Sequence, residues 1–342
     1  MNVLGFLRDA SYEKLGPVEF YRTLLPLREL NKQAEGIQTM CIDKATIKGM
    51  TDAELGGRDI YTMARMFTTE GHQAFVDEIH RTGGVLVLDC DDDLTEAYRM
   101  VSGRGSEFCE VLGMVDFVTV STQPLADLFA SHTQRAPVVL RNHVDSAWMK
   151  GIAARSRRLI DGLTIGFSGS PTHQGDWYLP HVPFFRIGKD FPEVALALHG
   201  DNLPRYLEHI PEGVRLLHME AVPFSEYPSR LAQFDIVLCA VDSGDGFNDG
   251  KSDLKALECM ALGIVPVCSQ FGPYVDLAAA GAPVVIIAEE SRDGWYEAMR
   301  DVIQLADWRR WLSGRGPEWV RENRDMVVSG WKQWATFCGR IV

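Results

Sequence analysis

The stretch FNDGKSDLKALECMALGIVPV, from Phe247 to Val267, joins a polar, glycine-containing loop to an apolar helix and a short apolar strand. Leu254, Leu257 and Ala261 recur at the spacing of one helix face. Glu258 follows Leu254 by four residues, so it falls on this apolar face rather than on the solvent side. A carboxylate in such a place needs a partner, because an unpaired buried charge is costly.

Two interpretations of this helix remain open from the spacing alone. In the first, the helix begins at Lys251 or Ser252, with Ser252 or Asp249 as its cap, and the free N–H groups and Lys251 bind a phosphate. Glu258 then lies roughly 10 Å further along the axis, where it can accept both hydroxyls of a ribose. In the second, Glu258 forms a buried ion pair with Lys255 or a distant arginine.

Short apolar runs alternate with segments of helical length on both sides of this stretch. We expect strands at NVLGFL, GIQTMCI, GGVLVLDCDDDL and MVDFVTVST, and again at TIGFSGS, VALALHG, VRLLHME, FDIVLCAVD, IVPVCS and APVVIIA. Such alternation is typical of parallel sheets covered on both faces, an α/β fold. Two runs meet near residues 145–162, which predicts two Rossmann-like domains at about 1–150 and 160–324. A helix at about 325–342 is expected to pack back on the first domain.

Length and composition support a two-domain protein that is soluble and cytoplasmic. The chain has 342 residues and a formal net charge of −13. Single cores stop growing near about 250–300 residues, and strong acidity disfavours unspecific binding to DNA or anionic membranes. No apolar run reaches the ~20 residues of a membrane span, and the start lacks the apolar stretch of a signal peptide. The seven cysteines show no CxxC spacing, so we expect buried free thiols rather than disulfides or zinc.

Polar loops follow several expected strands, where ligands of open parallel sheets bind. Asp89, Asp91, Asp92 and Asp93 end one strand, and carboxylates so close raise one another's pKa. We rank contact with a sugar or acceptor first, helix capping by Asp93 second and metal binding third.

Another loop, FSGSPTHQGD, offers a second set of polar groups. His173 and Asp176 are three residues apart and can share a helix face, while Gly169 and Ser170 can offer backbone N–H groups to a phosphate or sugar. Gly16, in the loop after the first strand, is a further place where backbone can approach a ligand. Cleft hydrogen bonding and simple capping remain open for the histidine and aspartate.

An ordered set of motifs resembles retaining glycosyltransferases of the GT-B class, specifically the family-4-like group. The motifs are VLDCDDDL, which resembles a segment of glycosyltransferase-like proteins of tailed phages, VDFVTVSTQPLADLF, VVLRNHVDSAW, GFSGSPTHQGDW and the opening stretch. The resemblance implies two domains facing across a cleft, a nucleotide-sugar donor and no metal. Many family-4 enzymes carry two glutamates eight positions apart. Glu258 matches the second, which implies a ribose contact, but the first falls at Gly250, so its role moves to Asp249 or Asp245 or is lost.

The resemblance implies a hexosyl- or pentosyltransferase that uses a UDP-, GDP- or dTDP-sugar and a hydroxyl acceptor. Phage-like relatives point to a hydroxymethylated DNA base, a virion protein or a glycan, and the net charge argues against DNA. Two alternatives stay open: a non-catalytic nucleotide- or sugar-binding module, and a nucleotide-sugar epimerase of the same fold. The expected catalytic residues are Asp91, Asp92, His173 and Lys251. The expected donor-binding residues are Gly16, Gly169, Ser170, Asp176, Asn248, Lys251, Ser252 and Glu258.

Overall fold

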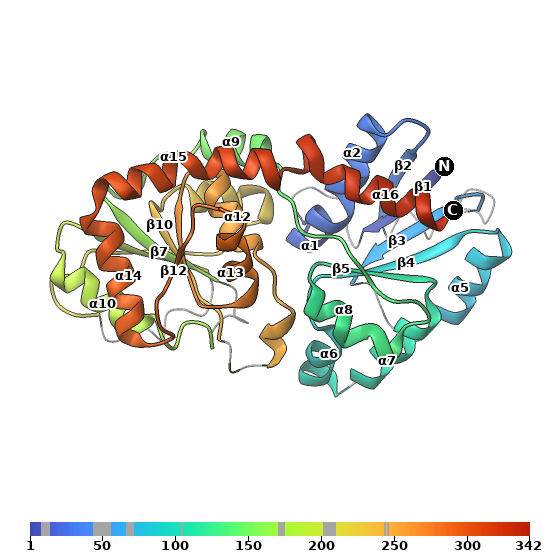
Figure 1. The fold of residues 1–342 in the computed structure, drawn as a ribbon, viewed down its shortest axis with the longest axis horizontal. Coiled ribbons are helices and arrows are strands. Elements are labelled where there is room, and N and C mark those ends of the chain that lie inside the picture. Colours follow the sequence, from blue (N-terminus) through green and yellow to red (C-terminus); the bar gives the residue numbers. More distant parts are fainter. Residues whose placement is uncertain are drawn as a thin grey trace. The chain divides into compact units, whose positions relative to one another are not determined.

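The chain forms two α/β units, each built on one parallel sheet. The computed structural model describes residues 1–7, 14–43, 56–65, 72–103, 105–169, 175–200, 210–242, 244 and 246–342. Unit 1 comprises residues 1–143, 247–252 and 326–342, and unit 2 comprises residues 144–246 and 253–325. Figure 1 shows the elements of both units along the chain.

The six strands of unit 1 are all parallel, in the order β2-β1-β3-β4-β5-β6. They are β1 (Asn2–Leu7), β2 (Gln38–Asp43), β3 (Ile60–Ala64), β4 (Val85–Cys90), β5 (Phe117–Val120) and β6 (Val138–Val139). The helices are α1 (Pro17–Glu19), the π-helical turn η1 (Phe20–Leu24), α2 (Leu25–Gln33), α5 (His72–Arg81), α6 (Leu94–Ser102), α7 (Gly105–Met114), α8 (Gln123–Phe129), the 3-10 turn η2 (Ala130–His132), the π-helical turn η7 (Met326–Gly330) and α16 (Trp331–Ile341). Helix α16, from the C-terminal end of the chain, packs beside α2 from its beginning (Figure 1).

Unit 2 has the order β12-β11-β10-β7-β8-β9, again all parallel. Its strands are β7 (Thr164–Ser168), β8 (Ala195–His199), β9 (Leu216–Met219), β10 (Ile236–Cys239), β11 (Val265–Cys268) and β12 (Val285–Ile286). Its helices are α9 (Ser146–Ala153), α10 (His181–Asp190), the 3-10 turn η5 (Phe224–Glu226), α11 (Tyr227–Leu231), α12 (Leu254–Ala261), α13 (Gly272–Ala279), α14 (Arg292–Gln304) and α15 (Ala306–Asn323). A further 3-10 turn, η6 (Gly246–Gly250), starts at the last residue of unit 2 before the chain enters unit 1.

Each unit has its own apolar core between sheet and helices, which explains the near-continuous apolar strands of the sequence. Strands β7 and β8 are buried at every residue, because helices cover both faces of their sheet. All seven cysteines are free thiols, as the sequence predicts, and five of them are buried: Cys90, Cys239, Cys259, Cys268 and Cys338. In the described part of the chain, no helix is long and apolar enough to cross a membrane.

Candidate functional site

Each sheet contains one point where the order of its strands reverses. In unit 2 the chain builds β7, β8 and β9 outward and then returns to place β10 on the other side of β7. In unit 1 the reversal lies between β1 and β3. Ligands of open α/β sheets bind outside the carboxyl ends of the strands at such points. Ser168 and Asp242 therefore mark the site of unit 2, and Arg65, which directly follows β3, marks that of unit 1.

The helix that carries Glu258 starts later than the sequence predicts. Helix α12 begins at Leu254 with Asp253 as its preceding residue, so the predicted start at Lys251 or Ser252 is wrong. The Asp253 side chain makes no cap; it forms an ion pair with Arg324 at 2.8 Å. The predicted burial of Glu258 is confirmed, because only 6% of this residue is exposed.

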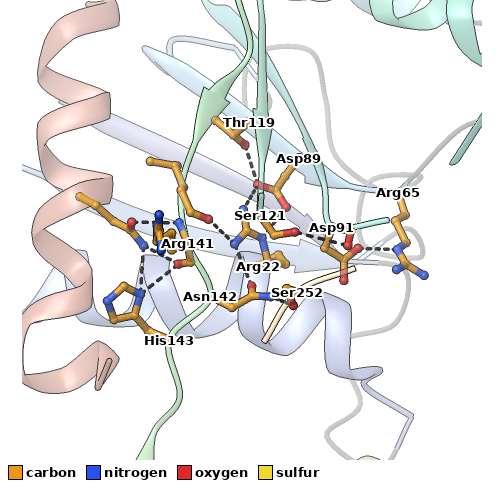
Figure 2. Close-up of polar contacts among 12 residues, drawn as sticks. Arg22, Arg65, Asp89, Asp91, Thr119, Ser121, Arg141, Asn142, His143 and Ser252 are labelled. Atoms are coloured by element: carbon orange, nitrogen blue, oxygen red, sulfur yellow. Dashed lines mark hydrogen bonds and ion pairs between the residues drawn. The ribbon is translucent and has the colours of Figure 1, made fainter. Parts of the chain in front are cut away.

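The loop that precedes α12 does not continue this helix toward Lys251, because residues 247–252 are held by contacts within unit 1. Thr122 donates its hydroxyl to the carbonyl of Gly250 at 3.0 Å. Asn142 donates its amide to the Ser252 hydroxyl at 2.8 Å, as Figure 2 shows. A Cβ at Gly250 would lie 2.5 Å from the Leu125 side chain, so a larger residue here would force Leu125 to shift. The predicted capping of α12 by Ser252 or Asp249 is wrong, because Asp253 occupies the N-cap position of this helix.

Glu258 lies in a polar cluster at the carboxyl end of β7 and β8. The Ser168 hydroxyl is 2.9 Å from Nδ1 of His199, and Ser168 also bonds the hydroxyl of Tyr227. Desolvation of this hydroxyl, together with the negative charge of Glu258, raises the pKa of Tyr227 well above its usual value. The carboxylate of Glu258 thus interacts electrostatically with the polar groups at the strand ends and is largely shielded from solvent.

The loops after β7 and β10 are held by backbone contacts. Asp176 is buried and accepts a hydrogen bond from the backbone N–H of Asp242 at 2.8 Å. The backbone N–H of Gly169 donates to the carbonyl of His199 at 3.1 Å. The expectation that this N–H offers itself to a phosphate is therefore wrong, because the strand-end contact already uses it. Gly200 has a φ of +125°, and a Cβ there would meet the Gly169 carbonyl oxygen at 1.9 Å.

In unit 1, Asp89 proves to be structural. Asp89 is fully buried, and each of its carboxylate oxygens accepts a hydrogen bond from Arg22 at 2.8 Å. Arg22 also donates to the Leu140 carbonyl and to Asn142, as Figure 2 shows. The π-helical turn around Arg22 buries four consecutive side chains, so this arginine faces the sheet instead of solvent. Asp89 is therefore engaged inside the unit, and it does not join the neighbouring carboxylates as a ligand group.

Asp91 and Asp92 directly follow the last residue of β4. Arg65 donates to Asp91 at 2.6 Å and to Asp92 at 2.8 Å (Figure 2 shows the first pair). Arg65 has a φ of +51°, and a left-handed backbone costs a non-glycine residue roughly 1–2 kcal/mol, which these ion pairs help to offset. Burial, and then the charge of Asp91, raise the pKa of Asp92 to about 6, although Arg65 and Lys251 oppose the rise. Helix capping by Asp93, the second of the ranked interpretations, is confirmed, since its carboxylate accepts from the N–H of Glu96 at 3.1 Å.

The structure divides the expected site residues between the two units. Unit 1 holds Gly16, Asp91, Asp92, Asn248, Lys251 and Ser252. Unit 2 holds Gly169, Asp176 and Glu258. Ser170 and His173 lie outside the described residues, as does Asp245. Among the residues that are described, no group of three histidines, cysteines or acids is placed to hold a metal ion.

Several polar residues of these sites escaped the sequence reasoning. Arg65 and Arg22 bind the aspartates of β4, and Tyr227 and Ser168 lie with Glu258. One signal was present: an acid inside the apolar run VLVLDC demands a buried cation. No comparable signal marks Tyr227, because its partners are distant in sequence.

Comparison with known proteins identifies relatives of the fold only. No protein-family model and no curated protein sequence matches the chain. Among solved structures, Anabaena HepE in complex with UDP and glucose is 13% identical, with 99% of each chain covered and a TM-score of 0.67. An α-glucosyltransferase, AGT, in complex with UDP is 12% identical over 99% of this chain and 100% of that one, with a TM-score of 0.64. The UDP-GlcNAc 2-epimerase of Neisseria meningitidis, bound to UDP-GlcNAc, is 11% identical over 99% and 100%, with a TM-score of 0.58.

These similarities span nearly the whole chain in each case, so they concern both units. Together with the two six-stranded parallel sheets, they assign the chain to the GT-B fold, as the sequence predicts. Glycosyltransferases and an epimerase share this fold.

Proposed function

We propose that this protein is a glycosyltransferase that moves a sugar from a nucleotide-sugar, a UDP-sugar first of all, to a hydroxyl acceptor with retention of configuration. The observation that carries the proposal is the buried carboxylate of Glu258, beside the strand ends at the reversal point of unit 2. The similar structures with UDP, of HepE and AGT, support a uridine nucleotide as the donor.

In unit 2, Glu258 accepts hydrogen bonds from the ribose hydroxyls. A second group on α12 supports this assignment: the ammonium of Lys255 lies 5.3 Å from the centre of the Phe167 ring on β7. This cation is therefore directed toward the strands of the same sheet, and it stabilises the negative charge of a leaving diphosphate. Lys251, which the sequence predicts to stabilise the diphosphate charge, is proposed for the same role.

In unit 1, Asp91 and Asp92 bind the acceptor hydroxyl. Arg65 fixes both carboxylates, and 23% of the Asp92 side chain stays exposed, so one oxygen can accept a proton or a hydrogen bond. A carboxylate whose pKa is about 6 is a suitable acceptor near neutral pH. Gly16, Asn248, Ser252, Ser170, Asp176 and His173 remain proposed contacts.

The direct test is binding of UDP to the wild type, Glu258→Gln and the control Glu297→Gln, measured by titration calorimetry. Glu297 is exposed on α14. Loss of a charged hydrogen bond of about 1.5–3 kcal/mol should weaken UDP binding by roughly 10- to 150-fold in Glu258→Gln. Glu297→Gln should bind as the wild type does. Equal affinity in all three proteins would contradict the ribose assignment.

The epimerase remains the second candidate, because an epimerase shares the fold over the whole chain. Incubation with UDP-glucose or UDP-GlcNAc without an acceptor separates the two functions. A transferase releases UDP faster when an acceptor is added, whereas an epimerase yields a second UDP-sugar in the NMR spectrum without releasing UDP. A protein that binds UDP but does neither is a binding module.

A further inference from the structure

A groove runs along unit 1 between strand β6 and helix α16, away from the reversal point of the sheet. It encloses about 480 Å³, which is within the range of about 300–1,000 Å³ for ligand sites. Its apolar lining includes Val138, Val139 and the rings of Phe117 and Phe337, whose centres are 6.1 Å apart. The groove thus offers an apolar floor beside the edge of a sheet.

The backbone of the edge strand is directed into this groove. On the covered side, Leu140 donates its N–H to the carbonyl of Val120 in β5 at 2.8 Å. Backbone groups of successive strand residues point to opposite sides, so Val139 and Arg141 face away from β5. Gln333 of α16 occupies the place of a neighbouring strand at Arg141: its amide accepts from the Arg141 N–H at 3.1 Å and donates to the Arg141 carbonyl at 2.7 Å. Val139, two residues earlier on the same side, presents its N–H and C=O to the groove.

The charged side chains that line the groove are all basic. Lys332 and Arg340 line it and are exposed, and Arg135 lies over the Phe117 ring at 4.6 Å. Among the described residues that line this groove, none is acidic. The whole chain, in contrast, carries a net charge of −13. A positive groove attracts negatively charged partners, whereas two copies of the groove that face each other carry the same charge and repel.

We propose that this groove binds an extended, acidic segment of a partner protein as an added strand beside β6. The N–H and C=O of Val139 pair with the backbone of that segment, and Gln333 limits how far it extends. Alternate side chains of the added strand lie on the apolar floor, while its carboxylates contact Lys332 and Arg340. This inference does not depend on the proposed transferase activity.

The test uses the full chain and two fluorescein-labelled peptides, measured by fluorescence anisotropy. One peptide of about ten residues alternates valine with glutamate, and the second alternates valine with lysine. We expect the acidic peptide to bind at least about tenfold more tightly, and its affinity to fall with salt, because opposite charges attract across the interface. The double variant Lys332→Glu, Arg340→Glu should weaken the acidic peptide by at least about tenfold.

Two further variants separate charge from backbone pairing. Val139→Pro removes the N–H that faces the groove, so it should weaken binding of the acidic peptide by about tenfold. The variant should still fold, since proline is tolerated on edge strands. Arg310→Glu changes an exposed arginine on α15 in unit 2 and should leave the affinity unchanged. Circular dichroism confirms that each variant is folded; the exposed charge variants keep the test valid if the proline variant is not.

Three outcomes would overturn the proposal: no binding of the acidic peptide, equal binding of both peptides, or an equal loss in Arg310→Glu. Sedimentation velocity adds a fourth. A dimer that the Lys332→Glu, Arg340→Glu variant dissociates would assign the groove to a second copy of the chain.

Discussion

Replacing Asp92 by asparagine should stabilise the fold. In the folded protein, burial raises the pKa of Asp92 from 3.8 to about 6, so ionising this carboxyl destabilises the fold. One pKa unit is worth about 1.4 kcal/mol, so ionisation of Asp92 costs the folded protein about 3 kcal/mol at pH values well above 6. Because the folded state holds the proton more tightly than the unfolded chain, the free energy of unfolding falls as the pH rises from 3.8 to about 6.

About half of this cost is already present at about pH 5, so a further ~1.4 kcal/mol should develop between about pH 5 and pH 8. Asparagine cannot ionise, so the free energy of unfolding of Asp92→Asn should gain this amount over the wild type across that range. Urea unfolding, followed by tryptophan fluorescence at several pH values, measures the difference. The control is Glu96→Gln. The hydrogen bond from Arg99 lowers the pKa of Glu96, so this carboxyl titrates below the pH range of the experiment. A difference between Asp92→Asn and the wild type that stays constant from about pH 5 to pH 8 would refute the reasoning.

Two further substitutions test the packing that holds the sites. Gly200→Ala should lower the free energy of unfolding by at least about 2 kcal/mol, because its Cβ collides with the Gly169 carbonyl. The control Gly213→Ala, at a φ of +83° and with open space around the Cβ, should cost only about 1 kcal/mol. Equal losses in urea unfolding would contradict the collision. Asp89→Ala should lower the free energy of unfolding by about 3–5 kcal/mol, because it leaves Arg22 buried without its carboxylate. The double variant Arg22→Met, Asp89→Leu should recover most of this loss. A double variant as unstable as the single one would show that the ion pair itself stabilises the unit.

The fold could be predicted from the sequence because its signal is repeated. Each buried strand, such as TIGFSGS or FDIVLCAVD, is a short apolar run, and parallel sheets require such runs to alternate with helices. The burial of Glu258 could also be predicted, since four residues separate it from Leu254 on one helix face. These features depend on local periodicity alone.

The helix start and the partners of the site could not be predicted in the same way. The loop before α12 is fixed by Leu125 and Asn142, which lie more than a hundred residues earlier in the chain. The pairing of Arg65 with Asp91 likewise depends on which strands are neighbours in the sheet. Tertiary contacts between distant segments therefore decided these details, and no local pattern encodes them.

The order in which the chain visits the two units has a consequence for biosynthesis. Unit 1 contains residues 1–143, but it also requires residues 247–252 and the final segment 326–342. A ribosome that has finished the first 143 residues has therefore not supplied all of this unit, whereas unit 2 is complete at residue 325. Residues 326–342 leave the ribosome only after all of unit 2, so unit 1 stays unfinished until this segment has been synthesised.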